Sequence, residues 1–268
     1  MAAFFIAMLL LRKQGAFALV KQVELNLRAY MRGSKFMCNR NINIAIDGPA
    51  AGGKTTVARI VAARLGLLYL DTGMMYRAAT WQALEKGCAL DDAQALGTLS
   101  QNLDLRLEPD ADSAAGCKVF VDGRDITSEL HSPRVSGSVS KVASCSAVRA
   151  DMVKRQKQIA DEGGIVMAGR DICTVVLPDA KLKYFLDASL EERSRRRLLD
   201  MQNRPGNTLT YDDIYKQLAE RDYEDTHRAD SPLVKAPGAS YIDCSSLSAE
   251  QVADIICHDY AEAVLAHE

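Results

Sequence analysis

The sequence predicts an α/β fold in which a parallel sheet is flanked by helices. Strand-like and helix-like stretches alternate from residue 42 onward, which is typical of such a sheet. A glycine-rich turn joins the first strand of this series to the first helix. The composition is that of a globular chain, with 48% hydrophobic and 25% charged residues among 268. These observations exclude a disordered chain, a collagen and a coiled coil.

Each expected element is defined by its apolar pattern and by the residues at its ends. The stretch Lys54–Leu65 is typical of a helix because its apolar residues form one stripe, and Gly66 is a natural end for it. Ser189 and Ser248 are each followed three residues later by Glu or Gln, which predicts capping boxes at the start of two further helices. The other expected elements are a helix at Gly73–Lys86 and strands at Ile42–Asp47, Leu67–Leu70, Ile165–Ala168, Leu182–Leu186 and Tyr241–Asp243.

The alternation is interrupted in the middle of the chain. Two apolar runs, Lys118–Val121 and Arg124–Thr127, flank Asp122 and Gly123. An Asp-Gly pair between such runs predicts a hairpin with a two-residue turn. Residues 100–145 are therefore expected to form a small antiparallel insertion in the α/β chain.

The glycine-rich turn carries the clearest chemical signal. Residues 48–55 match the pattern G-x-x-x-x-G-K-[ST] in its confirming context, after a strand and before a helix. Glycines let the backbone curl so that its N–H groups converge on phosphate oxygens, and the helix N-terminus adds positive potential. In such a P-loop, Lys54 is expected to reach the β- and γ-phosphates of ATP and Thr55 to bind Mg²⁺. The expected ATP-binding residues are Gly48, Pro49, Ala50, Ala51, Gly52, Gly53, Lys54, Thr55 and Thr56.

Two absent motifs and one arginine cluster narrow the class of P-loop protein to a small-molecule kinase. No Asn is followed by Lys, as the guanine-reading motif of GTPases requires, and no LSGGQ signature is present. Seven arginines fall within 36 residues, and anions such as a phosphorylated acceptor would neutralise them. The alternative is a solvated helix face whose arginines pair with neighbouring acids. The seven are Arg193, Arg196 and Arg197, which share a helix face by their spacing, and Arg195, Arg204, Arg221 and Arg228.

Five motifs together give the chain its resemblance to a known family. They are IDGPAAGGKTT at 46–56, LDTGMMYR at 70–77, SKVAS with VR at 140–149, GRD with TVVLPDA at 169–180, and ERDYEDTHRA at 220–229. From about Ile42 onward the chain resembles the bacterial-type cytidylate (CMP/dCMP) kinases of the nucleoside monophosphate kinase superfamily. The resemblance implies a kinase domain over residues 41–268, with a monophosphate-binding insertion at about 73–150 and an Arg-rich lid at about 190–207.

The resemblance also implies a reaction and roles for the matching residues. The γ-phosphoryl group of ATP would pass to CMP or dCMP with Mg²⁺ as cofactor, giving ADP and CDP or dCDP. Asp171 would accept from the amino group of cytosine and Arg149 would face its acceptors, whereas uracil reverses this pattern. The implied roles are Thr72, Arg149 and Asp171 for cytosine, Arg77, Arg170 and Arg228 for the monophosphate, Ser140, Arg221 and Asp225 for the sugar, and Lys54, Arg170, Arg193 and Arg197 for catalysis.

Two positions depart from the family's pattern. Many members carry an acid just before GRD, where this chain has Ala168, so a carboxylate that supports Mg²⁺ is missing at its usual place. Either Thr55, water and the phosphates hold the metal, or Asp47 takes part. Cys173 stands where the family commonly has Gly, and a buried, unreactive thiol is the expected interpretation.

Cysteine content and charge indicate where the chain acts and with which partners. Seven cysteines without a CxxC pair favour a reducing compartment, and a cytoplasmic monomer is expected.

The charge is distributed unevenly along the chain. Residues 1–40 carry seven Lys and Arg against one acid, which gives +6, and the remainder carries 26 against 34, which gives −8, so the net charge is −2. The body is acidic, and no nucleic-acid partner is expected. The apolar run Met1–Leu11 is too short to cross a bilayer, which needs about 20 residues.

Alternatives stay open for the acceptor and for the N-terminal extension at residues 1–40. A related kinase with another acceptor such as UMP is the nearest alternative activity, and a non-catalytic nucleotide-binding protein is a more distant one. For the extension, translation could begin at Met31 or Met37, the segment could target the chain or bind a membrane surface, or it could dock on the kinase.

Overall fold

The computed structural model describes residues 42–110, 116–202 and 208–266. All of them belong to the second of the two units into which the chain divides, Asn39–Glu268. The expected extension at 1–40 and residues 203–207 of the expected lid, Arg204 among them, lie outside the described residues. None of the described helices is long and apolar enough to span a membrane.

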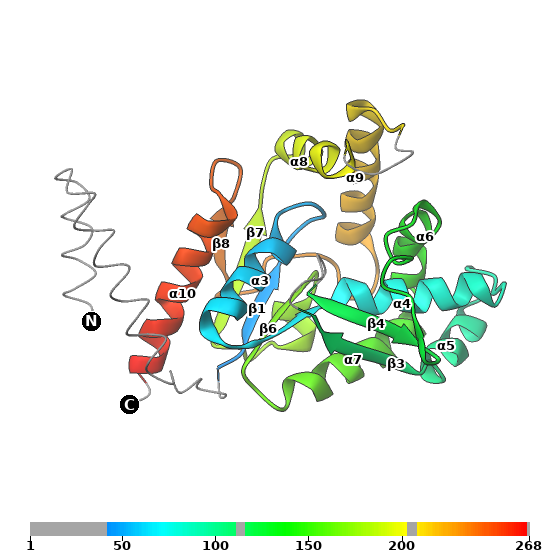
Figure 1. Cartoon of the computed structure of the whole chain (residues 1–268), viewed down its shortest axis with the longest axis horizontal. Helices are drawn as coiled ribbons and strands as arrows, with labels where there is room; N and C mark the ends of the chain where they lie inside the picture. Colours follow the sequence, from blue (N-terminus) through cyan, green and yellow to red (C-terminus); the bar gives the residue numbers. More distant parts are fainter. Residues whose placement is uncertain (1–41, 111–115, 203–207, 267–268) are drawn as a thin grey trace. The chain divides into compact units, whose positions relative to one another are not determined.

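A five-stranded parallel sheet forms the centre of this unit, as the alternating pattern predicts (Figure 1). In spatial order its strands are β2 (Leu68–Asp71), β6 (Ile165–Gly169), β1 (Ile44–Asp47), β7 (Leu182–Asp187) and β8 (Ser240–Asp243). Strands β1 and β6 are buried at every position, which explains why they are apolar apart from Asp47 at the end of β1. The carboxyl ends meet at one edge, where Asp47 is level with Gly169 and Phe185. Parallel sheets of this kind bind ligands at that edge.

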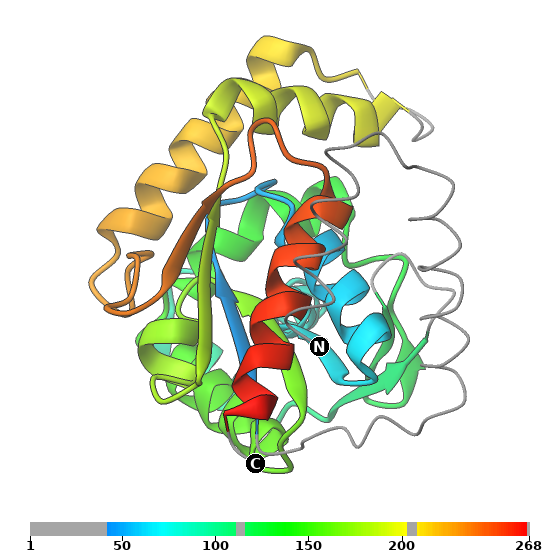
Figure 2. The same cartoon turned by 90° about the vertical axis from the view of Figure 1, so that its left-hand side faces the viewer.

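Helices α3 (Lys54–Leu65) and α10 (Ala249–Leu265) pack against each other beside the sheet (Figure 2). The bounds of α3 are the predicted ones, and Gly66 ends it with a φ of 67°. At the start of α10, Ser248 and Gln251 form the expected capping box. The expected helix after β2 is α4 (Thr72–Glu85), which begins one residue earlier than predicted.

The other expected capping box is only half formed. Helix α8 (Leu190–Gln202) begins after Ser189, whose hydroxyl accepts the N–H of Glu192 at 3.2 Å. The carboxylate of Glu192 does not reach back to the N–H of Ser189. It accepts hydrogen bonds from Arg195 and Arg196 instead, each at 2.7 Å. Two guanidinium donors compete successfully with one backbone N–H because hydrogen bonds between charged groups are the stronger.

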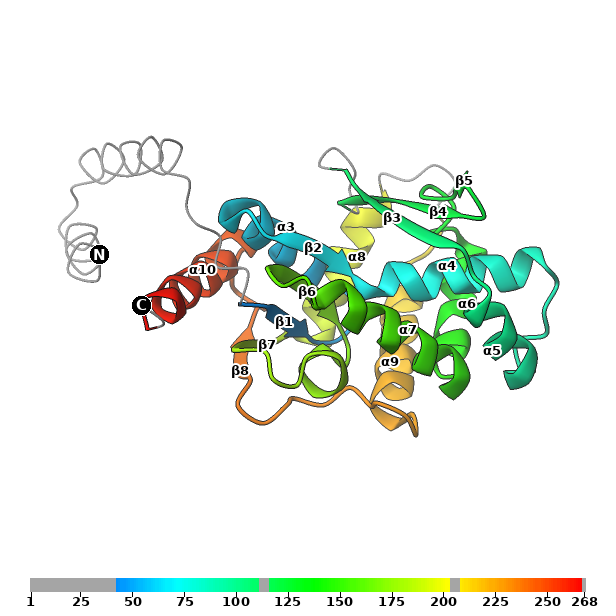
Figure 3. The ribbon, with the colours of Figure 1, turned by 90° about the horizontal axis from the view of Figure 1, so that it is seen from below.

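The insertion contains the expected antiparallel sheet, but the sheet is smaller than predicted (Figure 3). Its strands are β3 (Leu105–Pro109), β4 (Cys117–Val121) and β5 (Arg124–Asp125). Asp122 and Gly123 form the predicted turn with φ angles of 50° and 79°. The last strand stops before Thr127 because Asp125 accepts hydrogen bonds from both the N–H and the hydroxyl of Thr127.

Residues 133–143 of the region expected to be antiparallel form a helix instead, which corrects the prediction for residues 100–145. Ser132 caps α6 (Pro133–Ala143), and Pro133 at its first position favours a helix start. Helix α6 packs on α4, and α5 (Ala93–Gln101) packs on α7 (Ser146–Ala160). These helices and the small sheet share one apolar core with α4 and β6.

A second, smaller apolar cluster lies where α8 and α9 (Tyr211–His227) meet the glycine-rich turn. Ala50 of the turn packs with Ile214 and Leu218 of α9. Helix α9 opens with a complete capping box of Thr210 and Asp213, which a search for Glu or Gln alone overlooks. The turn is thus attached to the two helices that carry most of the clustered arginines.

Candidate active site

The turn between β1 and α3 has the backbone of a phosphate-binding loop. Gly48 passes β7 so closely that a Cβ atom there would lie 1.9 Å from the carbonyl oxygen of Leu186. Gly53 has a φ of 85° and Ala51 a φ of 57°, both in the left-handed region. The loop therefore curls at the N-terminus of α3, where N–H groups and the helix dipole attract anions.

Lys54 is buried within this loop. Its Nζ atom donates a 2.6 Å hydrogen bond to the carbonyl oxygen of Pro49. Burial lowers the pKa of Lys54 well below its ordinary value, and the neighbouring positive charge of Arg170 lowers it further. Negative charge brought into the loop would therefore stabilise the Lys54 ammonium.

The hydroxyl of Thr55, the expected Mg²⁺ ligand, donates to Asp71 at 2.8 Å. Asp47, the other residue considered for Mg²⁺, contacts the backbone instead. Its two carboxylate oxygens accept hydrogen bonds from the N–H groups of Ile172 and Cys173, both at 2.8 Å. These bonds hold the start of the short π-helix η1 (Ile172–Val176). The thiol of Cys173 is buried and its pKa is raised by burial, as expected of an unreactive cysteine.

Four largely buried arginines converge from separate parts of the chain. Arg77 lies on α4, Arg170 follows β6, Arg221 lies on α9, and Arg228 comes directly after α9. Asp225 accepts a 2.8 Å hydrogen bond from Arg170 and lies 3.6 Å from Arg228. Burial and then repulsion from neighbouring arginines lower the pKa of Arg77 and of Arg221 to about 10. This excess of positive charge favours an anionic ligand.

Arg149 of α7 and Asp171 after β6 form a buried ion pair, with side chains 4% and 5% exposed. A second guanidinium nitrogen of Arg149 donates to the carbonyl oxygen of Ala143 at 3.0 Å, so the end of α6 holds the pair in place. Both residues lie close enough to Arg228 to act on its pKa. Burial lowers that pKa most, the positive charge of Arg149 lowers it further, and the negative charge of Asp171 raises it. The structure thus brings the two predicted base-reading residues together, next to a predicted phosphate-binding arginine.

Thr72 and Ser140, the other predicted acceptor residues, have different surroundings. Thr72 is buried and donates its hydroxyl hydrogen to the carbonyl oxygen of Ala168 at 3.0 Å. Ser140 is half-buried on α6, one turn after Ser136. The hydroxyl of Ser136 accepts a 3.0 Å hydrogen bond from Arg77, so a serine that the motifs did not single out contacts a predicted phosphate-binding arginine.

Tyr76 and Gln156 belong to the same group, although the sequence analysis did not assign them. Among the described residues, the Tyr76 hydroxyl, the Gln156 amide nitrogen and Nε of Arg149 are buried without a hydrogen bond of good geometry, although the Gln156 side chain lies close to the Tyr76 hydroxyl. The Arg149 guanidinium lies 5.4 Å from the centre of the Tyr76 ring. Buried polar atoms without partners are costly, so several in one place indicate a site for a polar ligand. The position of Gln156, two helical turns after Arg149, is a signal that could have found it.

Arg193 and Arg197, both predicted to be catalytic, have different environments on α8. Arg193 is buried, donates to the carbonyl oxygen of Ala50 at 3.2 Å and forms an ion pair with Asp222 at 2.6 Å. It therefore connects the loop to α9. The charge of Arg197 lowers the pKa of Arg77 and of Arg221, which places it with the acceptor arginines.

Two other arginines of α8 lie at a cavity of about 440 Å³ beside the loop. Arg195 pairs with Glu192 at the surface, as the solvated alternative predicts. Arg196 pairs with Glu192 as well, and it also donates to the carbonyl oxygen of Cys244 at 2.5 Å. The rest of the cavity lining comprises Gly52, Gly53, Thr56, Val57 and residues 245–249 with Val252.

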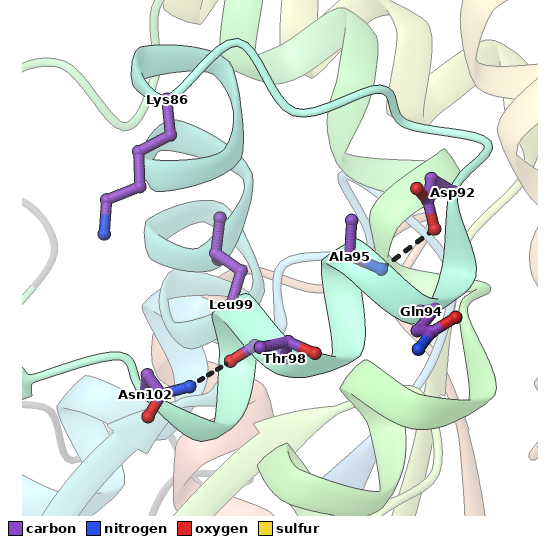
Figure 4. Close-up of a pocket in the computed structure, with 7 residues that line it drawn as sticks. All are labelled: Lys86, Asp92, Gln94, Ala95, Thr98, Leu99 and Asn102. Carbon is purple, nitrogen blue, oxygen red and sulfur yellow. Dashed lines mark hydrogen bonds between the residues drawn. The ribbon is translucent and has the colours of Figure 1, made fainter.

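A larger hollow of about 540 Å³ lies between the end of α4 and α5 (Figure 4). None of the predicted site residues lines it. Its two hydrogen bonds, from Ala95 to Asp92 and from Asn102 to Thr98, stabilise the ends of α5. It contributes nothing to the site around the loop.

The ion pairs of Glu192 with Arg195 and Arg196 predict how the stability of the fold changes at low pH. Hydrogen bonds from Arg195 and then Arg196 lower the pKa of Glu192 to about 2. A carboxyl whose pKa is lower in the folded state stabilises the fold above its unfolded pKa and loses that effect as the pH falls toward 2. We expect the urea midpoint of the Glu192→Gln variant to lie below that of the wild type at pH 7, with the gap shrinking between pH 5 and pH 3. Glu191→Gln is the control, and a gap of constant size at all pH values would contradict the prediction.

The site and the fold together define a class of protein, a P-loop kinase in which a phosphate-binding loop with a buried lysine faces a separate, arginine-rich acceptor site. The model of the cytidylate kinase family matches residues 44–262. A cytidylate kinase from Pelotomaculum thermopropionicum is 49% identical over 214 residues, which cover 80% of this chain and 93% of that protein. One from a Geobacillus species is 50% identical over 216 residues, which cover 81% and 95%. The chain belongs to the cytidylate kinase family, as its motifs predict.

Proposed function

We propose that this chain transfers the γ-phosphoryl group of ATP to CMP or dCMP, giving ADP and CDP or dCDP. Membership of the family supports the activity, since the curated relatives at 48–50% identity are named cytidylate kinases. In the structure, the buried pair of Arg149 and Asp171 carries the proposal, because it joins a donor and an acceptor suited to cytosine beside the phosphate-attracting Arg228. No observation favours UMP.

For ATP, we assign the phosphates to the loop of residues 48–56 and the nucleoside end to the neighbouring cavity. The curled backbone, the helix N-terminus and Lys54 support the first assignment. The second is supported by the position of the cavity, which is lined by Gly52 and Gly53 of the loop and extends to Arg196 and Ser245. ATP would then have its γ-phosphate toward the acceptor arginines.

For the acceptor, we assign the monophosphate to Arg77, Arg170 and Arg228 and the sugar to Ser140, Arg221 and Asp225. The unbalanced positive charge supports the phosphate assignment. Asp225 already binds Arg170, yet a carboxylate has about four lone-pair sites, so it can also accept a sugar hydroxyl. Thr72, Arg149 and Asp171 are assigned to the base, with Tyr76 and Gln156 beside them.

The proposed catalysis needs no covalent intermediate. Lys54, Arg170 and Arg197 bring the two phosphates into line and stabilise the charge on the transferring group. Arg193 holds the loop against α9, since its guanidinium is bonded to Ala50 and Asp222. Movement of the lid, at about 190–207, would exclude the water that otherwise hydrolyses ATP.

Kinases of this family use a divalent cation, and we propose Mg²⁺. The residues fit this ion, because hard cations prefer oxygen ligands and the Thr55 hydroxyl lies beside a carboxylate at the loop. When bound with ATP, the ion supplies positive charge that offsets the charge of the phosphates. The monomeric state, the cytoplasmic location and the division into an extension at 1–40 and a kinase domain at 41–268 stay predictions.

A panel of acceptors tests the proposed function. With ATP and Mg²⁺, release of ADP is measured for CMP, dCMP, UMP and AMP, and a reaction without acceptor gives the background. We expect kcat/KM for CMP or dCMP to exceed that for UMP at least tenfold, since uracil would present an acceptor to Asp171. Equal rates with UMP, or no acceptor-dependent ADP release, would overturn the proposal.

A further inference from the structure

The metal site at the loop needs a carboxylate that the family's usual position does not provide. Position 168 is Ala, and both carboxylate oxygens of Asp47 are bound to backbone N–H groups. Within the described ranges there is no group of three or more His, Cys, Asp or Glu that could hold a metal. Mg²⁺ is commonly held by one or two carboxylates together with substrate phosphates and water. A single well-placed acid would therefore suffice.

Asp71, at the end of β2, lies where such an acid is needed. In the register of the parallel sheet it is level with Ala168 of β6. Its Oδ2 atom accepts the hydroxyl of Thr55 at 2.8 Å, and its Oδ1 atom accepts the N–H of Gly73 at 2.9 Å. The bond to Gly73 caps α4 and fixes the carboxylate. The neighbouring strand thus provides the acid that β6 lacks.

The surroundings of Asp71 favour an ion with bound water. The charge of Asp71 acts on Lys54, Arg77 and Arg170, favouring the protonated form of each, so Asp71 belongs to the reaction site electrostatically. Tyr69 precedes Asp71 by two residues and so points to the same face of β2. Among the described residues, its buried hydroxyl has no hydrogen bond of good geometry, although it lies close to the Thr55 side chain. Such a hydroxyl is suited to a water molecule of a hydrated cation.

We propose that Asp71, together with Thr55, binds the divalent cation that accompanies ATP, either directly or through water. The proposal rests on the proposed function, because it requires ATP in the loop of residues 48–56. It assigns the acidic ligand of the metal to β2, one strand away from the family's usual position at 168.

The affinity of the full chain for Mn²⁺ tests this proposal without relying on turnover. Free Mn²⁺ is measured by electron paramagnetic resonance in the presence of a non-hydrolysable ATP analogue. We expect Asp71→Asn to weaken Mn²⁺ binding at least tenfold, while the affinity for the metal-free analogue changes less than threefold. Asn retains an oxygen that can cap α4, so the variant should stay folded. Mn²⁺ binding at wild-type affinity would overturn the proposal.

Asp187→Asn is the matched control for the loss of one negative charge. Asp187 ends the parallel strand β7 and likewise accepts a backbone N–H, that of Ala188 at 2.8 Å. Its other carboxylate oxygen lies 3.3 Å from the Tyr241 hydroxyl, away from Thr55. We expect its Mn²⁺ affinity to stay within threefold of the wild type. An equal loss in both variants would overturn a specific role for Asp71.

A second variant keeps the test decisive if Asp71→Asn does not fold. A thiolate prefers softer metal ions than a carboxylate does. We therefore expect Asp71→Cys to raise the ratio of Cd²⁺ affinity to Mn²⁺ affinity at least tenfold over the ratio for the wild-type chain. The wild-type ratio is the baseline because it includes any Cd²⁺ bound by the chain's own cysteines. An unchanged ratio would contradict the proposal. The acceptor panel distinguishes a failure of the metal assignment from a failure of the proposed function. If the wild type transfers phosphate to CMP while the Asp71 variants bind metal normally, only the metal assignment is refuted.

Discussion

Replacing Lys54 with alanine is expected to lower kcat at least a hundredfold while the chain stays folded. The Lys54 ammonium lies in the loop where the charge of the transferring phosphoryl group would develop. Loss of one such preorganised donor typically costs about 10²- to 10³-fold in kcat. Burial already lowers the pKa of Lys54, so removing the charged group relieves a desolvation cost in the folded state. The measurement is CMP-dependent ADP release at saturating ATP, with the melting temperature as the check on folding.

Lys183→Ala is a closely matched control. Its Nζ atom donates to the carbonyl oxygen of Pro178, five residues earlier, at 3.0 Å, just as Lys54 donates to Pro49 five residues earlier. Lys183 lies on β7, outside the loop. We expect kcat of this variant to stay within about twofold of the wild type, as surface changes usually have small effects. Turnover near the wild-type value in Lys54→Ala would contradict the proposed catalysis.

Replacing Asp171 with asparagine is expected to reduce the preference for CMP over UMP at least tenfold. Asp171 can only accept hydrogen bonds, which suits the amino group of cytosine, whereas the amide of Asn can also donate to the oxygen of uracil. A mismatched buried pair costs about 1–3 kcal/mol, and 1.36 kcal/mol corresponds to a factor of ten. The measurement is the ratio of kcat/KM for CMP to that for UMP within one preparation, so partial loss of folded protein cancels.

Asp151→Asn controls for the loss of an acid paired with arginine. Asp151 pairs with Arg155 at 3.0 Å on α7, the helix that also carries Arg149. Both substitutions should lower the melting temperature, and Asp171→Asn should lower it more, because leaving a buried partner unpaired costs about 3–5 kcal/mol. Only Asp171→Asn is expected to change the ratio. An unchanged ratio in that variant would place base recognition elsewhere.

Most elements of the fold could be predicted because their signals are local. The helix at Lys54–Leu65 and the turn at Asp122 and Gly123 each depend on a few neighbouring residues, and both were found as predicted. The half-formed capping box at Ser189 shows the limit of such signals. Its pattern is correct, but Glu192 has stronger partners one turn further along the helix. Competition between partners is not visible in a pattern that considers one bond at a time.

The sequence by itself determined the phosphate-binding loop, the parallel sheet and the family, because contiguous residues carry these signals. Only the tertiary structure decided how the buried charges are paired. Thr55 contacts Asp71 16 residues away, Asp47 binds Ile172 125 residues away, and Arg193 reaches Ala50 143 residues away. A buried charge must find a partner wherever the fold brings one within hydrogen-bond distance, since leaving it unpaired is costly. That choice depends on packing and strand register, which local sequence does not encode.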